Sequence, residues 1–216
     1  MKTNYQLMLD KTISEIEART DRSRPSLLLH ACCAPCSSYV LEYLNKYFNI
    51  TLLFYNPNIS ERAEHDVRYD ELRRLVKEMG LGDSVDIVCS DYEPHRFLQI
   101  SQGLEELPEG GARCRGCYEL RLKKAAEAAK EGGFDYFTTT LSISPHKRAD
   151  WLCDIGEELS KEYGVPYLFS DFKKKGGYLR SCQLSELYGL YRQDFCGCAY
   201  SKAAREKQKQ QKEQTT

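Results

Sequence analysis

The sequence lacks any apolar run near the roughly 20 residues that a helix needs to cross a lipid bilayer. The first ten residues, 1–10, are mixed polar and lack the apolar core of a secretory signal. We therefore expect a cytoplasmic protein with no membrane partner. Across 216 residues, 41% hydrophobic and 29% charged side chains are ordinary values for a soluble globular chain with one core.

An excess of charge of one sign is also missing. The 31 basic and 32 acidic side chains leave a formal net charge of −1. This excludes a chain-wide basic field for nucleic acid, so any RNA contact must come from local patches. Three basic runs are candidates, at 113–124, 146–148 and 173–180, and each could equally be an ordinary solvated face.

A glycine-rich phosphate-binding loop and a Walker lysine are absent as well. In an α/β sheet that activates ATP, such a loop usually follows the first strand. Here the residues after the first predicted strand are Cys-Cys-Ala-Pro-Cys-Ser-Ser, at 32–38. The sequence therefore argues against nucleotide hydrolysis.

Short apolar or β-branched runs alternate with amphipathic helical stretches along the whole chain. Strands are predicted at 26–31, 50–55, 85–88, 134–141 and 165–169, and helices at 3–19, 37–47, 61–79, 93–101, 115–130 and 147–163. This order predicts a single domain over 1–216, with an α/β, Rossmann-like three-layer fold and a mostly parallel sheet. Its end, 202–216, is predicted to be a flexible polar tail. Such sheets bind ligands beyond the carboxyl ends of their strands.

Cysteine is the residue present in excess, with 10 in the chain. Seven of them fall into three tight groups: Cys32, Cys33 and Cys36; Cys114 and Cys117; Cys196 and Cys198. In a reducing compartment, cysteines so close in sequence are metal ligands or redox thiols rather than disulfides. The first group follows a predicted strand. The second lies where a loop opens a helix, and a helix N-terminus lowers the pKa of a thiol.

The spacing within each group bears on metal binding. Two intervening residues let both thiolates of a pair face one metal, and Gly197 lets the chain bend between Cys196 and Cys198. Adjacent Cys32 and Cys33 are expected to diverge, and so to serve two nearby centres or to divide into a ligand and a catalytic thiol. Seven thiolates exceed the four of a structural zinc site and favour an iron–sulfur cluster with extra reactive ligands.

Other interpretations stay open at this point. A metal-free thiol–disulfide oxidoreductase needs only one exposed Cys-x-x-Cys, and a zinc-stabilised RNA-binding module needs only one zinc site. Cys89 and Cys153 are interpreted as packing residues, and Cys182 has no assigned role. His30 is either a hydrogen-bond donor behind the ligands or a satisfied core histidine.

The cysteine groups and the segments between them resemble the cobalamin-independent epoxyqueuosine reductases of the QueH type. The segments that carry the resemblance are HACCAPC at 30–36, FYNPNI at 54–59, RCRGCY at 113–118, TTTLSISPHK at 138–147, DFKKKGGY at 171–178 and YRQDFCGC at 191–198. They span nearly the whole chain, from 27 to about 202. Some members carry Asp where this chain has Cys36, and there the carboxylate helps to hold an extra iron. Here a thiolate takes that place.

The resemblance implies a HUP-type α/β fold, a 4Fe–4S cluster and one neighbouring mononuclear iron. The substrate would be tRNA that carries epoxyqueuosine in its anticodon loop, and an external donor would supply electrons. The last step of queuosine synthesis would remove the epoxide oxygen as water and leave an alkene. Cys114 and Cys117 would bind the cluster together with Cys32 or Cys33 and with the Cys196/Cys198 pair. The remaining thiolates and Cys36 would hold the second iron.

The same resemblance suggests roles for other side chains. The expected catalytic residues are Cys33, Cys36 and Tyr118; the proton-donor candidates are Tyr118, Tyr191 and His30; and the candidate surfaces for stacking on a splayed wobble base are Tyr55, Tyr178 and Tyr191. The loop 142–147 follows a predicted strand and is the candidate binding site for the cyclopentane diol of the modified base. The basic runs would bind flanking phosphates.

Overall fold

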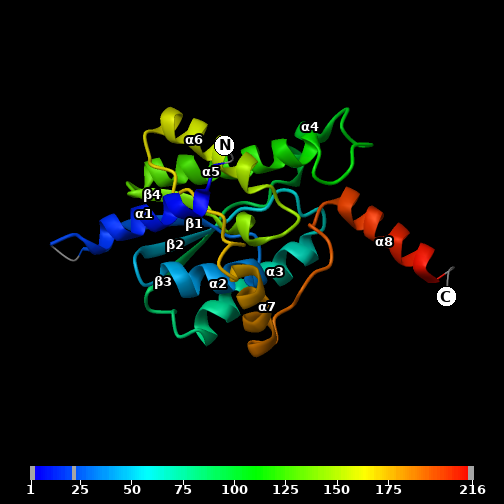
Figure 1. Ribbon diagram of the computed structural model, residues 1–216. Helices are drawn as coiled ribbons and strands as arrows, with labels where there is room; N and C mark the ends of the chain where they lie inside the picture. Colours follow the sequence, from blue (N-terminus) through cyan, green and yellow to red (C-terminus); the bar gives the residue numbers. More distant parts are fainter. Residues whose placement is uncertain (1–2, 21–22, 214–216) are drawn as a thin grey trace.

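The computed structural model describes residues 3–20 and 23–213, and its centre is one parallel sheet (Figure 1). The strands are β1 (Ser26–His30), β2 (Asn49–Phe54), β3 (Val85–Cys89) and β4 (Tyr136–Thr139), in the spatial order β3-β2-β1-β4. β1 lies between β2 and β4, with Leu29 paired to Leu52 on one side and to Thr138 on the other. The predicted α/β fold with a parallel sheet is confirmed.

Helices cover both faces of the sheet. They are α1 (Tyr5–Glu17), α2 (Ala34–Leu44), α3 (Arg62–Glu78), α4 (Pro94–Ser101), α5 (Ala112–Glu131), the 3₁₀ helix η1 (Thr140–Ile143), α6 (Ala149–Tyr163), α7 (Gly177–Leu187) and α8 (Ala199–Glu213). In Figure 1, α2, α3 and α7 lie below the sheet and α5 and α6 lie above it, which gives the three predicted layers. None of these helices is long and apolar enough to cross a membrane.

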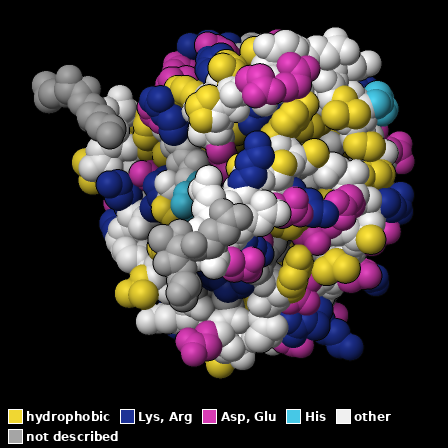
Figure 2. All heavy atoms as spheres, turned by 90° about the vertical axis from the view of Figure 1, so that its right-hand side faces the viewer, with side chains coloured by type: hydrophobic (Ala, Val, Ile, Leu, Met, Phe, Trp, Pro, Cys, Tyr) yellow, Lys and Arg dark blue, Asp and Glu magenta, His cyan; other side chains and the backbone are white. Residues whose placement is uncertain are grey.

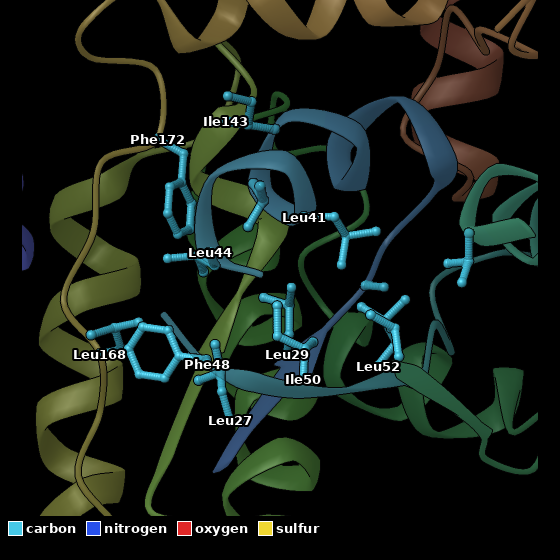
Figure 3. Packing of buried hydrophobic residues seen from close by; sticks show 14 of the residues in the cluster. Leu27, Leu29, Leu41, Leu44, Phe48, Ile50, Leu52, Ile143, Leu168 and Phe172 are labelled. Carbon is cyan, nitrogen blue, oxygen red and sulfur yellow. The ribbon is translucent and has the colours of Figure 1, made fainter. Parts of the chain in front are cut away.

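The core has two halves because the central strands are buried on both sides. Leu27 and Leu29 of β1 belong to the apolar cluster on the α2 side, where Phe48 and Phe172 also pack (Figure 3). Leu28, between them in sequence, belongs to the cluster on the α5 and α6 side. This alternation is the two-residue period of a strand, and it explains why β1 is apolar throughout.

The strand order creates a crevice at the carboxyl end of the sheet. The chain runs from β1 to β2 and β3 in one direction and then adds β4 on the other side of β1. At such a reversal the connections after the two neighbouring strands, here β1 and β4, lead to opposite faces and leave a space for ligands. The first cysteine group follows β1, and η1 follows β4, so both border this crevice.

Two of the predicted elements differ from the structure. The predicted strand at 165–169 is reduced to an isolated bridge between Phe137 and Tyr167. Pro166 has no backbone N–H to donate to the ladder, which prevents a regular edge strand there. The predicted strand at 134–141 ends at Thr139, where the chain tightens into η1.

The C-terminal part, which includes the predicted polar tail, is helical over most of its length. From Ala199 to Glu213 the chain is helical, as α8, and in Figure 1 this helix extends away from the body of the protein. Its residues are almost all exposed, and only Ser201 is buried. The last three residues of the predicted tail, 214–216, lie outside the described part of the chain.

Packing of α7 on α2 gives a prediction for stability. A Cβ atom added at Gly177 would lie 2.0 Å from the carbonyl oxygen of Phe172 and 2.5 Å from Cε1 of Tyr39. Gly177→Ala must therefore displace backbone, and we expect it to lower the free energy of unfolding by about 1–3 kcal/mol in urea titrations. The matched control is Gly82→Ala, where a Cβ meets nothing within 4 Å. Equal stability of the two variants would contradict this packing.

Candidate functional site

A cavity of about 520 Å³ opens at the carboxyl end of the sheet, where β1 and β4 diverge. Its wall includes the thiols of Cys32, Cys33, Cys36 and Cys196. The rest of the lining includes the segment after β2, residues 143–147 from the end of η1 onward, residues 192–196 before α8, and side chains of α3, α5, α7 and α8. Segments far apart in sequence thus meet at the edge where a parallel sheet binds ligands.

The thiols of Cys32, Cys33 and Cys36 form a compact group. Their sulfur atoms all lie within 4.8 Å of one another, and the Sγ atoms of Cys32 and Cys33 are 3.7 Å apart. The expectation that these adjacent side chains diverge is therefore wrong. Cys33 has an extended backbone (φ −173°, ψ 166°) as the N-cap of α2, and the first turn of that helix brings Cys36 back toward the pair.

This geometry fits metal binding. Thiolates that bind one tetrahedral ion at about 2.3 Å lie about 3.8 Å apart, close to the separation of the first two sulfurs. Three soft sulfur donors suit iron–sulfur centres or zinc and not magnesium or calcium. The residues present therefore fit the kind of metal centre that the sequence predicts.

Of the other two cysteine groups, Cys196 lines the same cavity, whereas Cys114, Cys117 and Cys198 are not among its lining residues. Cys114 and Cys117 lie in the first two turns of α5, and Cys196 and Cys198 immediately precede α8. Cys117 shares a small apolar cluster with Cys198. Burial raises the pKa of Cys117, and the negative charge of Cys196 also raises it. Within the described residues, these four thiols do not form a further group of three as compact as the first.

Hydrogen-bond donors surround the sulfur atoms. The N–H of Gly110 donates to Sγ of Cys114 at 3.3 Å, and the N–H of Ser201 donates to Sγ of Cys198 at 3.4 Å. Gly197 has φ +111°, and a Cβ there would lie 3.0 Å from Cγ1 of Ile59. The glycine is thus required both for the bend between the two cysteines and for the close approach of the neighbouring loop.

The thiols differ in their affinity for protons. Hydrogen bonds from Cys33 and Cys36 hold the pKa of Cys32 well below its usual range, and a hydrogen bond from Cys198 does the same for Cys196. The hydrogen bond to Cys32 raises the pKa of Cys33 to about 12, and burial raises that of Cys117 to about 11. The groups at 32–36 and 196–198 thus each contain one cysteine, Cys32 or Cys196, whose thiolate is stabilised by hydrogen bonds from neighbouring thiols.

A buried polar network lies directly behind the cysteines. His30 is fully buried, with Nδ1 2.8 Å from Oγ1 of Thr139 and Nε2 3.0 Å from the carbonyl oxygen of Tyr55. Burial, reinforced by the charge of Arg121, lowers the pKa of His30 to about 3. The imidazole is therefore neutral and hydrogen-bonded within the core, as one of the two interpretations of His30 expected.

Asn56 joins this network and was not singled out from the sequence. Its amide donates to the carbonyl oxygen of Ala31 at 3.0 Å, and its oxygen accepts a hydrogen bond from Arg121. A polar residue directly after a buried parallel strand is the signal that could have identified it. Thr140 is another polar residue directly after a buried parallel strand, and its hydroxyl lies 3.5 Å from Sγ of Cys32.

The structure separates the four candidate tyrosines. Tyr178 is 39% exposed and lines the cavity, so its ring is accessible there. Tyr55 is buried, with its hydroxyl donating to Glu93, and cannot stack on a base. Tyr191 is half-exposed and donates to the carboxylate of Glu64. Tyr118 is buried on α5 behind the cavity, and burial raises its pKa above the usual value.

The basic runs are not the surface patches that the sequence suggested. Arg113 and Arg121 are buried, Lys147 pairs with Glu109, and most of the third run is also paired with acids. Basic and acidic side chains are interspersed over the face that carries α8 (Figure 2). The excess of positive charge lies in the cavity, whose lining includes Arg68, Arg121, Lys147, Arg192 and Arg205 but only Glu109 and Asp194 among acids.

The three cysteines outside the groups take different positions. Cys153 is buried in the core of α6, as its interpretation as a packing residue predicts. Cys89, at the end of β3, is exposed, so the same interpretation is wrong for it. Cys182 is half-buried on α7 and does not line the cavity.

Comparisons with known proteins identify the family. The family model described as "Epoxyqueuosine reductase QueH" matches residues 27–204. Proteins named epoxyqueuosine reductase QueH are 42% identical in Streptococcus pyogenes, over 93% of this chain and 80% of that protein, and 43% identical in Staphylococcus epidermidis, over 93% and 85%. The protein of that name from Staphylococcus aureus is 40% identical over 93% and 84%.

Among solved structures, an NMN synthetase from Francisella tularensis aligns with 93% of this chain and 90% of its own, with 10% identity and a TM-score of 0.38. That likeness is too distant to carry an argument about this protein. The match to the family model and the identity to the named relatives both extend over most of the chain. The chain belongs to the epoxyqueuosine reductase QueH family.

Proposed function

We propose that this protein is an epoxyqueuosine reductase that converts epoxyqueuosine to queuosine at the wobble position of tRNA. The observation that supports this most directly is that four cysteines, from two of the three groups, line one cavity in a chain of this family. The cytoplasm, where thiols stay reduced, is the compartment we propose for the reaction.

The reaction is a reductive removal of oxygen. Both carbon–oxygen bonds of the epoxide break, a carbon–carbon double bond forms, and the oxygen leaves as water. Two electrons and two protons are consumed, and the electrons come from an external donor. The protein must therefore deliver electrons, deliver protons and stabilise negative charge as it develops on the oxygen.

We further propose that the cysteines hold a 4Fe–4S cluster and one additional iron. Cys114 and Cys117 would bind the cluster, with further thiolates from Cys32 or Cys33 and from the Cys196/Cys198 pair. Cys36 would bind the second iron with the thiolates that remain, and the compact first group supports a metal at that place. When bound, the cluster supplies electrons singly, and an iron with an open position acts as a Lewis acid on oxygen.

Side chains of the cavity wall can bind and orient the substrate. The side-chain oxygens of Asn58 and Gln193 line the cavity, are buried, and find no hydrogen-bond partner in the described structure. They can accept hydrogen bonds from hydroxyl groups such as those of the cyclopentane diol. Ser144 of the loop 142–147 also lines the cavity, whereas Ser142 is buried against Ser170.

Lys147 is placed to counter negative charge on the departing oxygen. Its side chain is only 9% exposed, lies at the cavity wall and pairs with Glu109 at 3.2 Å. Although burial acts in the opposite direction, the charge of Cys196 raises its pKa above the usual value, so it stays cationic. Tyr118 is the proposed proton donor, with Cys33 and Cys36 at the reacting centre.

The cationic lining of the cavity supports a polyanionic substrate. A cleft lined by charges of one sign attracts an oppositely charged ligand over long range. Single-stranded RNA loops stack their bases on aromatic rings and place their phosphates on basic side chains. Tyr178 places such a ring at the cavity. Arg192 also lines the cavity, and its guanidinium donates a hydrogen bond to the hydroxyl of Ser185.

An assay under anaerobic conditions tests the reaction. Full-length protein loaded with iron and sulfide is given a chemical reductant and tRNA that contains epoxyqueuosine, and the nucleosides are read by mass spectrometry. We expect a product lighter by one oxygen. An unchanged base with a fully loaded cluster would defeat the assigned reaction. Colourless protein without iron would favour the thiol–disulfide oxidoreductase, and one zinc per chain would favour the RNA-binding module.

Single substitutions test the metal ligands. Cys117→Ala removes a proposed cluster ligand, so we expect loss of most iron and acid-labile sulfide together. Cys36→Ala removes a proposed ligand of the second iron, so we expect about one iron fewer with sulfide retained. Cys182→Ala, on α7 away from the cavity, is the control and should bind metal as the wild type does. Metal contents that are the same in all three variants would refute the assignment.

Substitution of Arg192 tests the tRNA site. If its guanidinium binds a phosphate, Arg192→Ala should weaken tRNA binding and reduce the slope of log affinity against log salt by about one. Arg73→Ala is the matched control, because Arg73 is 62% exposed on α3 and does not line the cavity. Fluorescence anisotropy with labelled tRNA over a salt series measures both. An unchanged salt slope in Arg192→Ala would exclude this contact.

A further inference from the structure

Among the residues that the structure describes, three arginines are buried, and two of them have evident partners. Arg68 pairs with the carboxylate of Glu64 at 2.7 Å. Arg113 donates to the carbonyl oxygens of residues 104, 105 and 107 at 2.7–2.8 Å, and its guanidinium also lies over the ring of Tyr200. Both arginines thus have anionic or strongly dipolar acceptors that compensate for burial.

Arg121 is the exception. It is 2% exposed, and within residues 3–20 and 23–213 it makes no ion pair with a carboxylate. Its partners are the side-chain oxygen of Asn56 and Nε2 of His30, which is 3.3 Å from its Nε. Both groups are neutral. A buried cation without an anion is costly, so the compensating charge must come from elsewhere.

The candidates for that charge are sulfur atoms. Cys114, Cys117 and Arg121 are spaced i, i+3 and i+7 along α5 and so share one face of the helix. Arg121 also lines the cavity, together with Cys32, Cys33, Cys36 and Cys196. Burial alone would lower the pKa of Arg121, but the charges of neighbouring cysteines, among them Cys32 and Cys196, raise it. Arg121 therefore lies near members of all three cysteine groups.

We propose that Arg121 is the internal counter-ion of the sulfur-rich metal centre, an inference that rests on the proposed function. The centre becomes more negative on reduction, and a fixed buried cation beside it stabilises that state. Arg121 therefore raises the reduction potential of the centre and slows the loss of its metal. It is a positioning and electrostatic residue, and contact with the substrate is not part of this role.

The geometry also explains why the cation is arginine. A guanidinium presents donors in a fixed fork, and here one edge reaches His30 at the end of β1 while another reaches Asn56 after β2. Asn56 in turn donates to Ala31, next to the first cysteine group. Arg121 thus ties α5, which carries Cys117, to the loop that carries Cys32. A lysine could supply the charge but could not make both hydrogen bonds in the same arrangement.

Three substitutions separate charge from hydrogen bonding. Arg121→Lys keeps the charge, Arg121→Gln keeps some hydrogen bonding without charge, and Arg121→Met removes both. Arg73→Gln, on the exposed face of α3, is the control for net charge. Each full-length protein is loaded with iron and sulfide under anaerobic conditions. The measurements are the midpoint potential by EPR-monitored titration, the rate of iron loss to a chelator, and the melting temperature.

We expect the Gln and Met variants to have a lower midpoint potential and to lose iron at least about tenfold faster than the wild type. The Lys variant should have a midpoint potential closer to that of the wild type, and the Arg73→Gln control should have the wild-type midpoint potential. If the Met variant does not fold, the Lys and Gln variants carry the comparison, because each retains a donor to Asn56.

Two outcomes would overturn the inference. A Gln variant with the wild-type potential and wild-type rate of iron loss, whatever its melting temperature, would leave Arg121 only a structural role while the proposed function stands. A wild-type protein that takes up no iron would remove the metal centre, and with it both the proposed cofactor and the counter-ion.

Discussion

The organisation of this protein depends on one electrostatic constraint, which is how several thiolates are held together at one edge of a sheet. Close thiolates repel one another and prefer protons unless positive charge or hydrogen-bond donors compensate them. The structure supplies both. The cysteines lie at or beside the N-termini of α2, α5 and α8, where unpaired N–H groups and the helix dipole favour negative charge, and Arg121 adds a buried full charge.

The sheet topology makes this compensation possible. Reversal of the strand order beside β1 opens the crevice, and the helices α2 and α3 begin after the carboxyl ends of β1 and β2. The loop after β1 is short, so Cys33 becomes the N-cap of α2 without an intervening segment. The apolar clusters on both faces of β1 hold this loop in place. Packing and site geometry are therefore linked through one central strand.

The cavity combines the metal-binding wall with a wall suited to an organic substrate. Cysteines form one part, and Asn58, Gln193, Tyr178 and Arg192 form another. The local basic runs suggested a binding surface for RNA on the exterior. In the folded protein most of those side chains are buried or paired, and the cationic excess is concentrated where the cavity opens. The candidate metal ligands and the candidate substrate-binding side chains thus line the same cavity.

The sequence by itself determined the α/β class, the parallel sheet and the three cysteine groups, because hydrophobic period and residue spacing are local properties. It also identified the segment after β1 as a site, because parallel strands end at a common edge. Only the tertiary structure decided that Cys32 and Cys33 converge, that Tyr55 faces Glu93 and not a ligand, and that Arg121 is buried among thiols without a carboxylate. These facts depend on burial and on partners brought together from distant segments, and no local pattern encodes the charge balance of a site assembled in that way.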